Sequence, residues 1–369
     1  MDPKHQTMLK AIARHVDELM SLPNVVRVAV AHKFIKGKEM PYPCISVGVE
    51  MKCSTALLPQ GGAVPKEWRG HITDVVRDGV ITAPPALNRL RGDSYRDLLK
   101  HNPQTRMRPI HPGCSIAHEE STAGTLGAIV RCRATDALLF LTNCHVAALS
   151  GAAQERDPIL QPGPYDGGKE PADRVAQLWR FLAIRFLDAP APPMACPWFN
   201  RAVAATRTLT SNTSTRNKAA KLLNLAAKVL HRKSRASVEV TNTIDAAVCY
   251  PSVALDVNYL GIGTPYGGAT IESKIGLEVV TSGRTAPFVS QGRVIGVGAT
   301  VDIGYGEGRT ARFVDQVLFS PISQPGDSGS LIMSTPGLYP VALLFAGSDQ
   351  LTIGNPIQAV LDGMDVRLV

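Results

Sequence analysis

Three short segments of the chain contain residue types that nucleophilic catalysis requires. One of them, Gly326-Asp327-Ser328-Gly329, places a serine between glycines and is followed by the apolar run 331–333. A serine hydroxyl is a weak nucleophile, so it needs exposure on a tight turn, a nearby base and backbone N–H groups directed at the developing oxyanion. Because glycine at 326 permits backbone conformations closed to other residues, we expect the N–H groups of Gly326 and Ser328 to form this oxyanion hole.

The other two segments supply a base and a carboxylate. His145 follows the apolar run 139–142, a predicted strand whose end would hold the imidazole rigidly for proton transfer from a serine oxygen. Asp245 opens the apolar run 246–248, so we expect its carboxylate to be partly buried. Such a carboxylate holds an imidazole in the tautomer that presents its free nitrogen to Ser328.

Together these residues resemble the catalytic residues of the chymotrypsin-like (trypsin-like) serine proteases, whose order along the chain is His, Asp, Ser. The order here is His145, Asp245, Ser328, and the resemblance covers about residues 113–369. It implies that the histidine is the general base, the aspartate its orienting partner and the serine the nucleophile. It also implies a double β-barrel with the site in the cleft, and an endopeptidase acting through an acyl-enzyme. Within the family the chain is similar to a divergent intracellular bacterial branch.

The same resemblance assigns residues that bind the polypeptide substrate. Phe345, Ala346 and Gly347 match the strand that binds the substrate backbone. Ile322 stands six residues before the serine, at the position that sets primary specificity in the family. Because this position holds no acid, we expect an apolar or small residue before the cleaved bond, and not Lys or Arg.

The sequence leaves open the partner of Asp327, the identity of the catalytic carboxylate and an alternative function. Secreted relatives pair the aspartate before the serine with a freed amino terminus, so Asp327 needs another partner here, or the chain is latent until the segment 106–111 is cut or a partner binds. Asp188 and Asp302 are alternative carboxylates, which we interpret as solvated loop acids. The alternative function is a catalytically silent module of the same fold that recruits a protein or nucleic acid.

Other reactive side chains have simpler interpretations. Cys144 adjoins His145, but neighbours on a strand point to opposite faces, so we interpret the cysteine as a core residue. His111, Cys114 and His118 include metal-ligating types, yet a site would need a fourth ligand. We interpret them as ordinary loop residues, and we expect neither a metal nor a cofactor.

The first 80 residues are predicted to form a small α/β N-terminal domain. Apolar residues at helical spacing over 4–20 predict a helix, and the runs 25–34 and 44–51 are typical of strands. The segment 81–112 is rich in proline and arginine and is predicted to be a linker. We expect the N-terminal domain to bind a regulatory protein partner.

The protease-like region 113–369 contains many short apolar runs separated by glycine or proline, which favours a mainly β fold. An insertion, 190–237, interrupts this pattern, and 9 Lys and Arg lie between 201 and 235 without any acid. Such a run is usually a solvated loop, which is the interpretation we favour. The alternative is a surface for nucleic acid or an acidic partner, but the insertion lacks aromatic residues for base stacking from 209 to 237.

Composition limits the compartment and the class of protein. The net charge is +8, from 39 Lys and Arg minus 31 Asp and Glu, while 44% of residues are hydrophobic and 19% charged, which excludes a disordered chain. No apolar run reaches the roughly 18 residues that span a bilayer, so we expect no membrane association. The 7 cysteines form no Cys-x-x-Cys pair, so we expect reduced thiols and the cytosol.

Overall fold

The computed structural model describes residues 3–83, 102–187, 240–265, 269–285 and 289–369. Its strands form one sheet of 8 strands and one of 10, so the expectation of a mainly β fold is confirmed. The basic insertion 190–237 lies outside the described residues. Within the described ranges, no helix is both long and apolar enough to cross a membrane.

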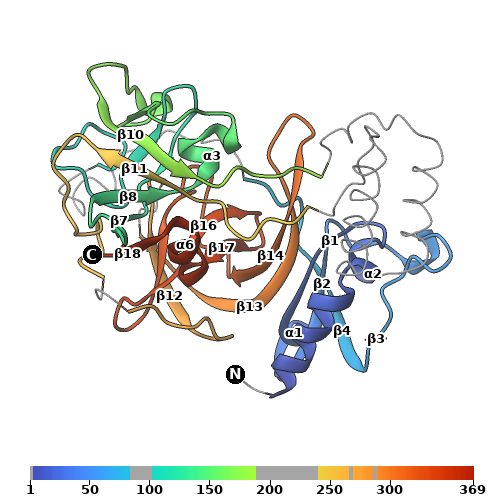
Figure 1. The fold of residues 1–369 in the computed structure, drawn as a ribbon. Coiled ribbons are helices and arrows are strands. Elements are labelled where there is room, and N and C mark those ends of the chain that lie inside the picture. Colours follow the sequence, from blue (N-terminus) through green and yellow to red (C-terminus); the bar gives the residue numbers. More distant parts are fainter. Residues whose placement is uncertain (1–2, 84–101, 188–239, 266–268, 286–288) are drawn as a thin grey trace, which may run out of the picture.

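The eight-stranded sheet carries the segments that lead to His145 and Asp245. Its strands lie in the order β18-β7-β8-β11-β10-β9-β5-β6, and Thr142 at the end of β8 pairs with Ala247 at the start of β11. Because β8 precedes the histidine and β11 follows the aspartate, this antiparallel pairing brings both residues to the same end of two neighbouring strands. Figure 1 shows β8 and β11 side by side. The strands are β5 (Ser115–His118), β6 (Gly124–Thr125), β7 (Ala128–Cys132), β8 (Leu138–Thr142), β9 (Pro158–Leu160), β10 (Arg174–Phe181), β11 (Ala247–Pro251) and β18 (Val366–Leu368).

The ten-stranded sheet carries the serine, in the loop from β14 to β15. Its order is β12-β15-β16-β17-β14-β13-β1-β2-β4-β3, and β12 also pairs with β13, so the six strands from β12 to β17 close into a barrel. Register shifts between Val294 and Val301 let the long strand β13 bend as it leaves the barrel. The strands are β1 (Val25–Ile35), β2 (Lys38–Val49), β3 (Glu67–Trp68), β4 (His71–Arg77), β12 (Glu278–Ser282), β13 (Val289–Gly304), β14 (Thr310–Phe319), β15 (Leu331–Ser334), β16 (Pro340–Gly347) and β17 (Thr352–Pro356).

The N-terminal region contains the expected helix and strands, and these strands continue the sheet of the barrel. β1 pairs antiparallel with β13, with Val30 opposite Val297, and β2 pairs parallel with β4. Figure 1 shows these elements in blue beside the orange strands β13 and β14. The sheet is therefore shared between the two regions, and a domain boundary at residue 80 stays a prediction.

Short helices complete the fold. The apolar side of α1 buries Met8 and Ile12 in the cluster that also contains Val28 of β1, as its helical spacing requires. The one-turn helix α3 follows β8, and α6 covers strands near the C-terminus with Val360 and Met364 buried. The helices are α1 (Pro3–His15), α2 (Asp17–Met20), α3 (Cys144–Ala147) and α6 (Ile357–Met364), with 3₁₀ turns η1 (Thr55–Leu57), η2 (Leu149–Gly151) and η3 (Pro164–Asp166).

The described parts of the predicted linker 81–112 belong to the core. Ile81, Ala83, Met107 and Ile110 are all buried in the cluster that contains aromatic side chains of the barrel. An apolar side chain excluded from water adds favourable free energy to folding, so these positions anchor the segment to the protein. The proline and arginine pattern did not reveal this, because the four anchors follow no helical or strand periodicity. Residues 84–101 lie outside the described residues.

Candidate active site

His145 lies in the one-turn helix α3 and not at a strand end, so that detail of the sequence prediction is wrong. β8 ends at Thr142, and Asn143 keeps an extended backbone with φ −80° and ψ 154° before the helix begins at Cys144. The side chain of Asn143 donates to the backbone carbonyl of Asp245 at 2.7 Å. The histidine is therefore held by a short turn that is itself bonded to the neighbouring segment.

His145 and Asp245 form a buried pair. Asp245 is fully buried, and its Oδ2 lies 2.6 Å from Nδ1 of the imidazole, while its Oδ1 accepts the backbone N–H of His145 at 3.2 Å. An ionised carboxylate only accepts hydrogen bonds, so the proton of the neutral ring sits on Nδ1. Nε2 of His145 has no hydrogen-bond partner among the described residues, and it carries the free lone pair that a general base needs.

Tyr305 is a third member of this group that the sequence did not reveal. Its hydroxyl donates to Oδ2 of Asp245 at 2.9 Å, and its ring meets the ring of His145 edge to face at 5.9 Å between centroids. Burial raises the pKa of Tyr305 well above its usual value, and the charge of Asp245 raises it further. The phenol therefore stays protonated and remains a donor to the carboxylate. The backbone N–H of Asp245 is fixed in turn by Asn355 Oδ1 at 3.0 Å.

Replacing Tyr305 with Phe is expected to lower kcat/KM for an ester substrate roughly tenfold, since a hydrogen bond to a charged group is lost. Without the phenol, Asp245 loses a side-chain donor and holds the imidazole of His145 less firmly. A positioning role lowers kcat and leaves KM near its wild-type value, and thermal unfolding shows whether the change acts through stability instead. Tyr250→Phe, at an exposed position of β11, is the matched control. A folded variant with kcat within twofold of wild type would contradict the role.

The loop that carries Ser328 depends on two glycines. Gly326 and Gly329 have φ of +103° and +98°, in the region that favours glycine. A side-chain carbon at Gly329 would also lie 2.2 Å from the carbonyl oxygen of Thr125, so the loop packs directly on the eight-stranded sheet. Thr125 holds the loop by donating its backbone N–H to the Ser328 carbonyl at 2.8 Å and its hydroxyl to the Gly326 carbonyl at 3.0 Å.

The loop and the histidine turn meet at Gly124. A side-chain carbon there would lie 2.4 Å from Val146 of α3 and 3.0 Å from the carbonyl oxygen of Ser328. Ser328 Oγ donates to the carbonyl of Phe345 at 3.4 Å, and no hydrogen bond joins it to His145 among the described residues. Hydrogen bonds of this kind often tighten only when substrate binds.

Asp327, next to the candidate nucleophile, is held by the backbone. Its Oδ1 accepts the N–H of Thr285 at 2.8 Å and its Oδ2 accepts that of Gln324 at 2.9 Å. Gly283 makes room, since a side-chain carbon there would lie 2.4 Å from Oδ1. Asp327 therefore has backbone partners in the structure. Latency until the segment 106–111 is cut or a partner binds stays a prediction.

The ionisation of Asp327 is expected to affect stability. Burial raises its pKa from 3.8 to about 7, against the opposing hydrogen bonds from Gln324 and Thr285 and the charge of Arg284. Between these two pKa values the folded protein keeps a proton that the unfolded chain has lost. The stabilisation that this difference gives is fully present below pH 3.8 and is lost as pH rises through about 7. Relative to Asp327→Asn, wild type should lose roughly 1 kcal/mol per pH unit between about pH 5 and 6.5 in urea unfolding. Parallel pH dependences, or a wild type that gains stability, would contradict this.

A buried ion pair is linked by hydrogen bonds to the loop that carries Asp327 and Ser328. Arg284 is fully buried and donates from Nε to Asp166 Oδ2 at 2.7 Å and from Nη2 to Oδ1 at 2.6 Å. Ser115 of β5 donates to the same carboxylate at 2.6 Å. Arg284 Nη1 reaches the hydroxyl of Thr285 at 3.1 Å, and that hydroxyl donates to the carbonyl of Pro325 at 2.9 Å. A continuous chain of polar contacts thus runs from the eight-stranded sheet to the loop that carries Ser328.

A cavity of ≈450 Å³ lies beside Ser328. Of the predicted substrate-binding residues, Ala346 and Gly347 line it, whereas Phe345 is fully buried against Phe313 with 4.7 Å between ring centroids. Ile322 does not line the cavity, because its apolar side chain packs into a hydrophobic cluster. The lining residues are Val80, Thr82, Ser323, Gln324, Pro325, Ser328, Leu344, Ala346, Gly347, Ser348 and Asp349.

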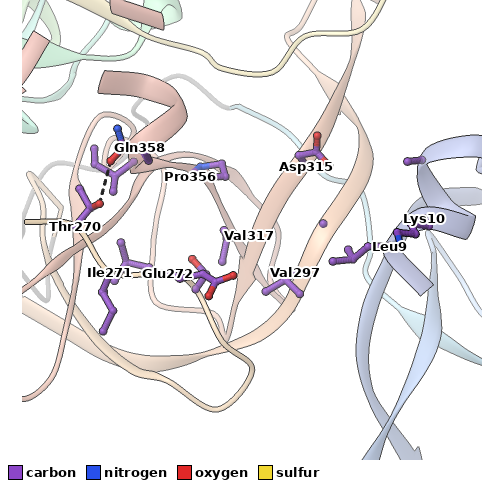
Figure 2. Close-up of a pocket in the computed structure, with 15 residues that line it drawn as sticks. Leu9, Lys10, Thr270, Ile271, Glu272, Val297, Asp315, Val317, Pro356 and Gln358 are labelled. Carbon is purple, nitrogen blue, oxygen red and sulfur yellow. Dashed lines mark hydrogen bonds between the residues drawn. The ribbon is translucent and has the colours of Figure 1, made fainter. Parts of the chain in front are cut away.

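A second cavity, of ≈670 Å³, lies between α1 and the barrel, away from these residues. Figure 2 shows Leu9 of α1 on one side of it and Val317 and Ile271 on the other. Thr270 donates to Gln358 at its edge at 3.1 Å. Its lining contains no histidine or cysteine, and we assign it no part in acyl transfer.

The remaining reactive side chains have structural surroundings. Cys144 is buried, and burial together with the charge of Asp245 raises the pKa of its thiol, so the core interpretation is confirmed. Asp302 pairs with Arg312 at 2.7 Å and 2.8 Å, while Asp188 lies outside the described residues.

The predicted metal alternative finds no support within the described ranges. His118 Nε2 lies 3.1 Å from Asp157, and His111 Nδ1 lies 3.3 Å from the carbonyl of Asn258. Cys114 is fully buried, and burial raises the pKa of its thiol to about 12. Among the described residues, no group of three or more His, Cys, Asp or Glu is placed to hold a metal ion.

Comparison with known proteins gives likenesses among solved structures. No family model matches the chain, and no curated protein matches it. It is similar to a glutamic acid specific serine protease (14% identity, 70% of this chain, 100% of that chain, TM-score 0.40). It is also similar to protease A of Thermobifida fusca (12%, 70%, 98%, 0.41) and a chymotrypsin of Cellulomonas bogoriensis (12%, 70%, 99%, 0.39). The strand pairings described above, and not these likenesses, define the fold.

Proposed function

We propose that this chain is a serine endopeptidase that cleaves polypeptides through an acyl-enzyme. Ser328 Oγ attacks the carbonyl carbon of the scissile bond while His145 Nε2 takes the hydroxyl proton. The imidazolium then gives that proton to the leaving amine as the carbon–nitrogen bond breaks. A water molecule, deprotonated by the same nitrogen, hydrolyses the ester and restores Ser328. Asp245 holds the ring in the required tautomer, and the N–H groups of Gly326 and Ser328 stabilise the oxyanion.

One observation carries this proposal: a buried carboxylate bonded to Nδ1 of a histidine whose Nε2 is unpartnered among the described residues. An unmade hydrogen bond at a buried polar atom costs free energy, so an open Nε2 beside a bonded Nδ1 favours a role in proton transfer. Here Nε2 of His145 is buried and left without a partner, while Nδ1 is 2.6 Å from Asp245. The arrangement leaves one nitrogen available for a proton from Ser328, whose loop packs against the same turn across Gly124.

A fluorophosphonate probe tests the proposal, because it reacts with activated serine hydroxyls. The full chain is expected to be labelled, and Ser328→Ala and His145→Ala are expected to abolish labelling. Ser121→Ala and His71→Ala, at partly exposed positions on other elements, are the matched controls and should label like wild type. A folded wild-type chain that takes up no probe would favour the catalytically silent binding module.

The cysteines support a reducing compartment, and with it the cytosol. Six cysteines are free in the described part of the chain: Cys44, Cys53, Cys114, Cys132, Cys144 and Cys249. Protein thiols stay reduced in the cytosol, where glutathione and thioredoxin maintain them. Cys196 lies outside the described residues. A regulatory partner for the N-terminal region and a nucleic acid for the basic insertion both stay predictions.

A further inference from the structure

A short stretch of the predicted linker lies in the candidate cleft. Thr82 pairs with Gly347 at the end of β16, donating its N–H to the Gly347 carbonyl at 3.1 Å and accepting the Gly347 N–H at 3.0 Å. On its other side, Ala83 donates to the Gly304 carbonyl at 3.1 Å, and Gly304 donates to the Ile81 carbonyl at 3.1 Å. Residues 81–83 thus form an inserted strand between the ends of β13 and β16.

This inserted strand uses every main-chain hydrogen-bonding group of Gly347. A residue offers one N–H donor on its backbone and one carbonyl, and both of these bond to Thr82 in an antiparallel bridge. The strand is anchored on either side, since Ile81 is 3% exposed and Ala83 is 7% exposed. Val80 and Thr82 line the same cavity as Ser328. The chain therefore fills part of its own candidate binding cleft.

We propose that residues 81–83 occupy the place that an extended substrate backbone would take at Gly347. The inference rests on the proposed function and on the predicted role of the strand Phe345 to Gly347 in binding the substrate backbone. A peptide that adds a strand to a sheet edge needs free main-chain groups on that edge, and those of Gly347 are taken. The chain with its inserted strand in place accepts small acyl substrates at Ser328 and excludes extended peptides. Displacement of residues 81–83 opens the cleft to peptides.

Two substrates of different length separate the inserted strand from the chemistry. p-Nitrophenyl acetate has no backbone to pair with Gly347, whereas an acetylated tetrapeptide p-nitroanilide ending in leucine needs that edge. Both rates are corrected for the Ser328→Ala background. In Thr82→Pro the N–H donated to Gly347 is removed, and in Ile81→Ala the buried anchor is shortened. Thr82→Val keeps both backbone bonds and is the matched control.

We expect Thr82→Pro and Ile81→Ala each to raise kcat/KM for the tetrapeptide at least tenfold, with the acetate ester within twofold of wild type. Thr82→Val should keep the wild-type ratio of the two rates. Circular dichroism establishes that each variant is folded, and if Thr82→Pro does not fold, Ile81→Ala decides. Unchanged tetrapeptide hydrolysis in a folded variant that still hydrolyses the ester would overturn the inference. If the wild-type chain hydrolyses the ester no faster than Ser328→Ala, the proposed function is overturned, and this inference with it.

Discussion

Asp245→Asn is expected to lower kcat/KM for an ester substrate by about 10³–10⁴-fold without unfolding the protein. The carboxylate accepts hydrogen bonds from His145 Nδ1 at 2.6 Å and from the Tyr305 hydroxyl at 2.9 Å. An amide at this site presents an N–H to one of these partners, which favours the tautomer with the proton on Nε2. That nitrogen then has no lone pair for the proton of Ser328, so the nucleophile stays protonated.

Steady-state kinetics with a matched carboxylate variant test this result. Asp302→Asn removes a carboxylate that pairs with Arg312, and it is expected to leave kcat/KM within threefold of wild type. Thermal unfolding of both variants shows whether either change acts through stability. If Asp245→Asn is folded and keeps more than a tenth of the wild-type rate, the orienting role is contradicted.

Arg284→Met is expected to lower the free energy of unfolding by about 3–5 kcal/mol. The guanidinium is fully buried and makes both of its short bonds, at 2.6 Å and 2.7 Å, to the carboxylate of Asp166, which is 2% exposed. Removing the guanidinium leaves the buried carboxyl group of Asp166 without its charged partner. The polar contacts from Arg284 to Thr285 and onward to Pro325 are lost as well.

Urea unfolding of two further variants separates the ion pair from the loss of side-chain volume. Arg284→Met with Asp166→Leu removes both charges, and we expect it to recover part of the lost stability. Arg131→Met removes an exposed arginine that pairs with Asp136 at 3.3 Å, and it should change the free energy of unfolding by less than about 1 kcal/mol. A cost below about 1 kcal/mol for Arg284→Met would show that the buried pair does not stabilise the fold.

The candidate site residues could be predicted from the sequence because each sits in a local pattern. Each pattern can be recognised within about ten residues: a serine between glycines, a histidine after an apolar run, and an aspartate before another apolar run. The structure brings His145 and Asp245 together as that order implied, through the pairing of β8 with β11. Ser328 reaches the same region through the loop that packs on Thr125.

Long-range partners carried no such signal. Tyr305 is 60 residues from Asp245 in the chain, and Arg284 is 118 residues from Asp166. Neither pair belongs to a local motif, so only the fold brings the partners together. A lone tyrosine between Gly304 and Gly306, in the turn from β13 to β14, was the one available hint.

Two predicted regions have surroundings that their local sequence does not show, and their predicted roles stay predictions. Ile322 was expected to shape the substrate pocket, but an apolar side chain gains free energy by leaving water, and here a hydrophobic cluster lies within reach. The stretch 81–112 is predicted to be a linker because it is rich in proline and arginine. Its isolated apolar residues, such as Ile81 and Ile110, are the ones that the core takes up.

Trapping the acyl-enzyme and locating it by mass spectrometry tests the proposed role of Ser328 most directly. The full chain is mixed with p-nitrophenyl acetate, quenched in acid within seconds, digested and sequenced by fragmentation. We expect one acetyl group on Ser328, present in wild type and absent in His145→Ala. An acetyl group on another residue such as Ser330, or no covalent adduct while ester is still being hydrolysed, would contradict it.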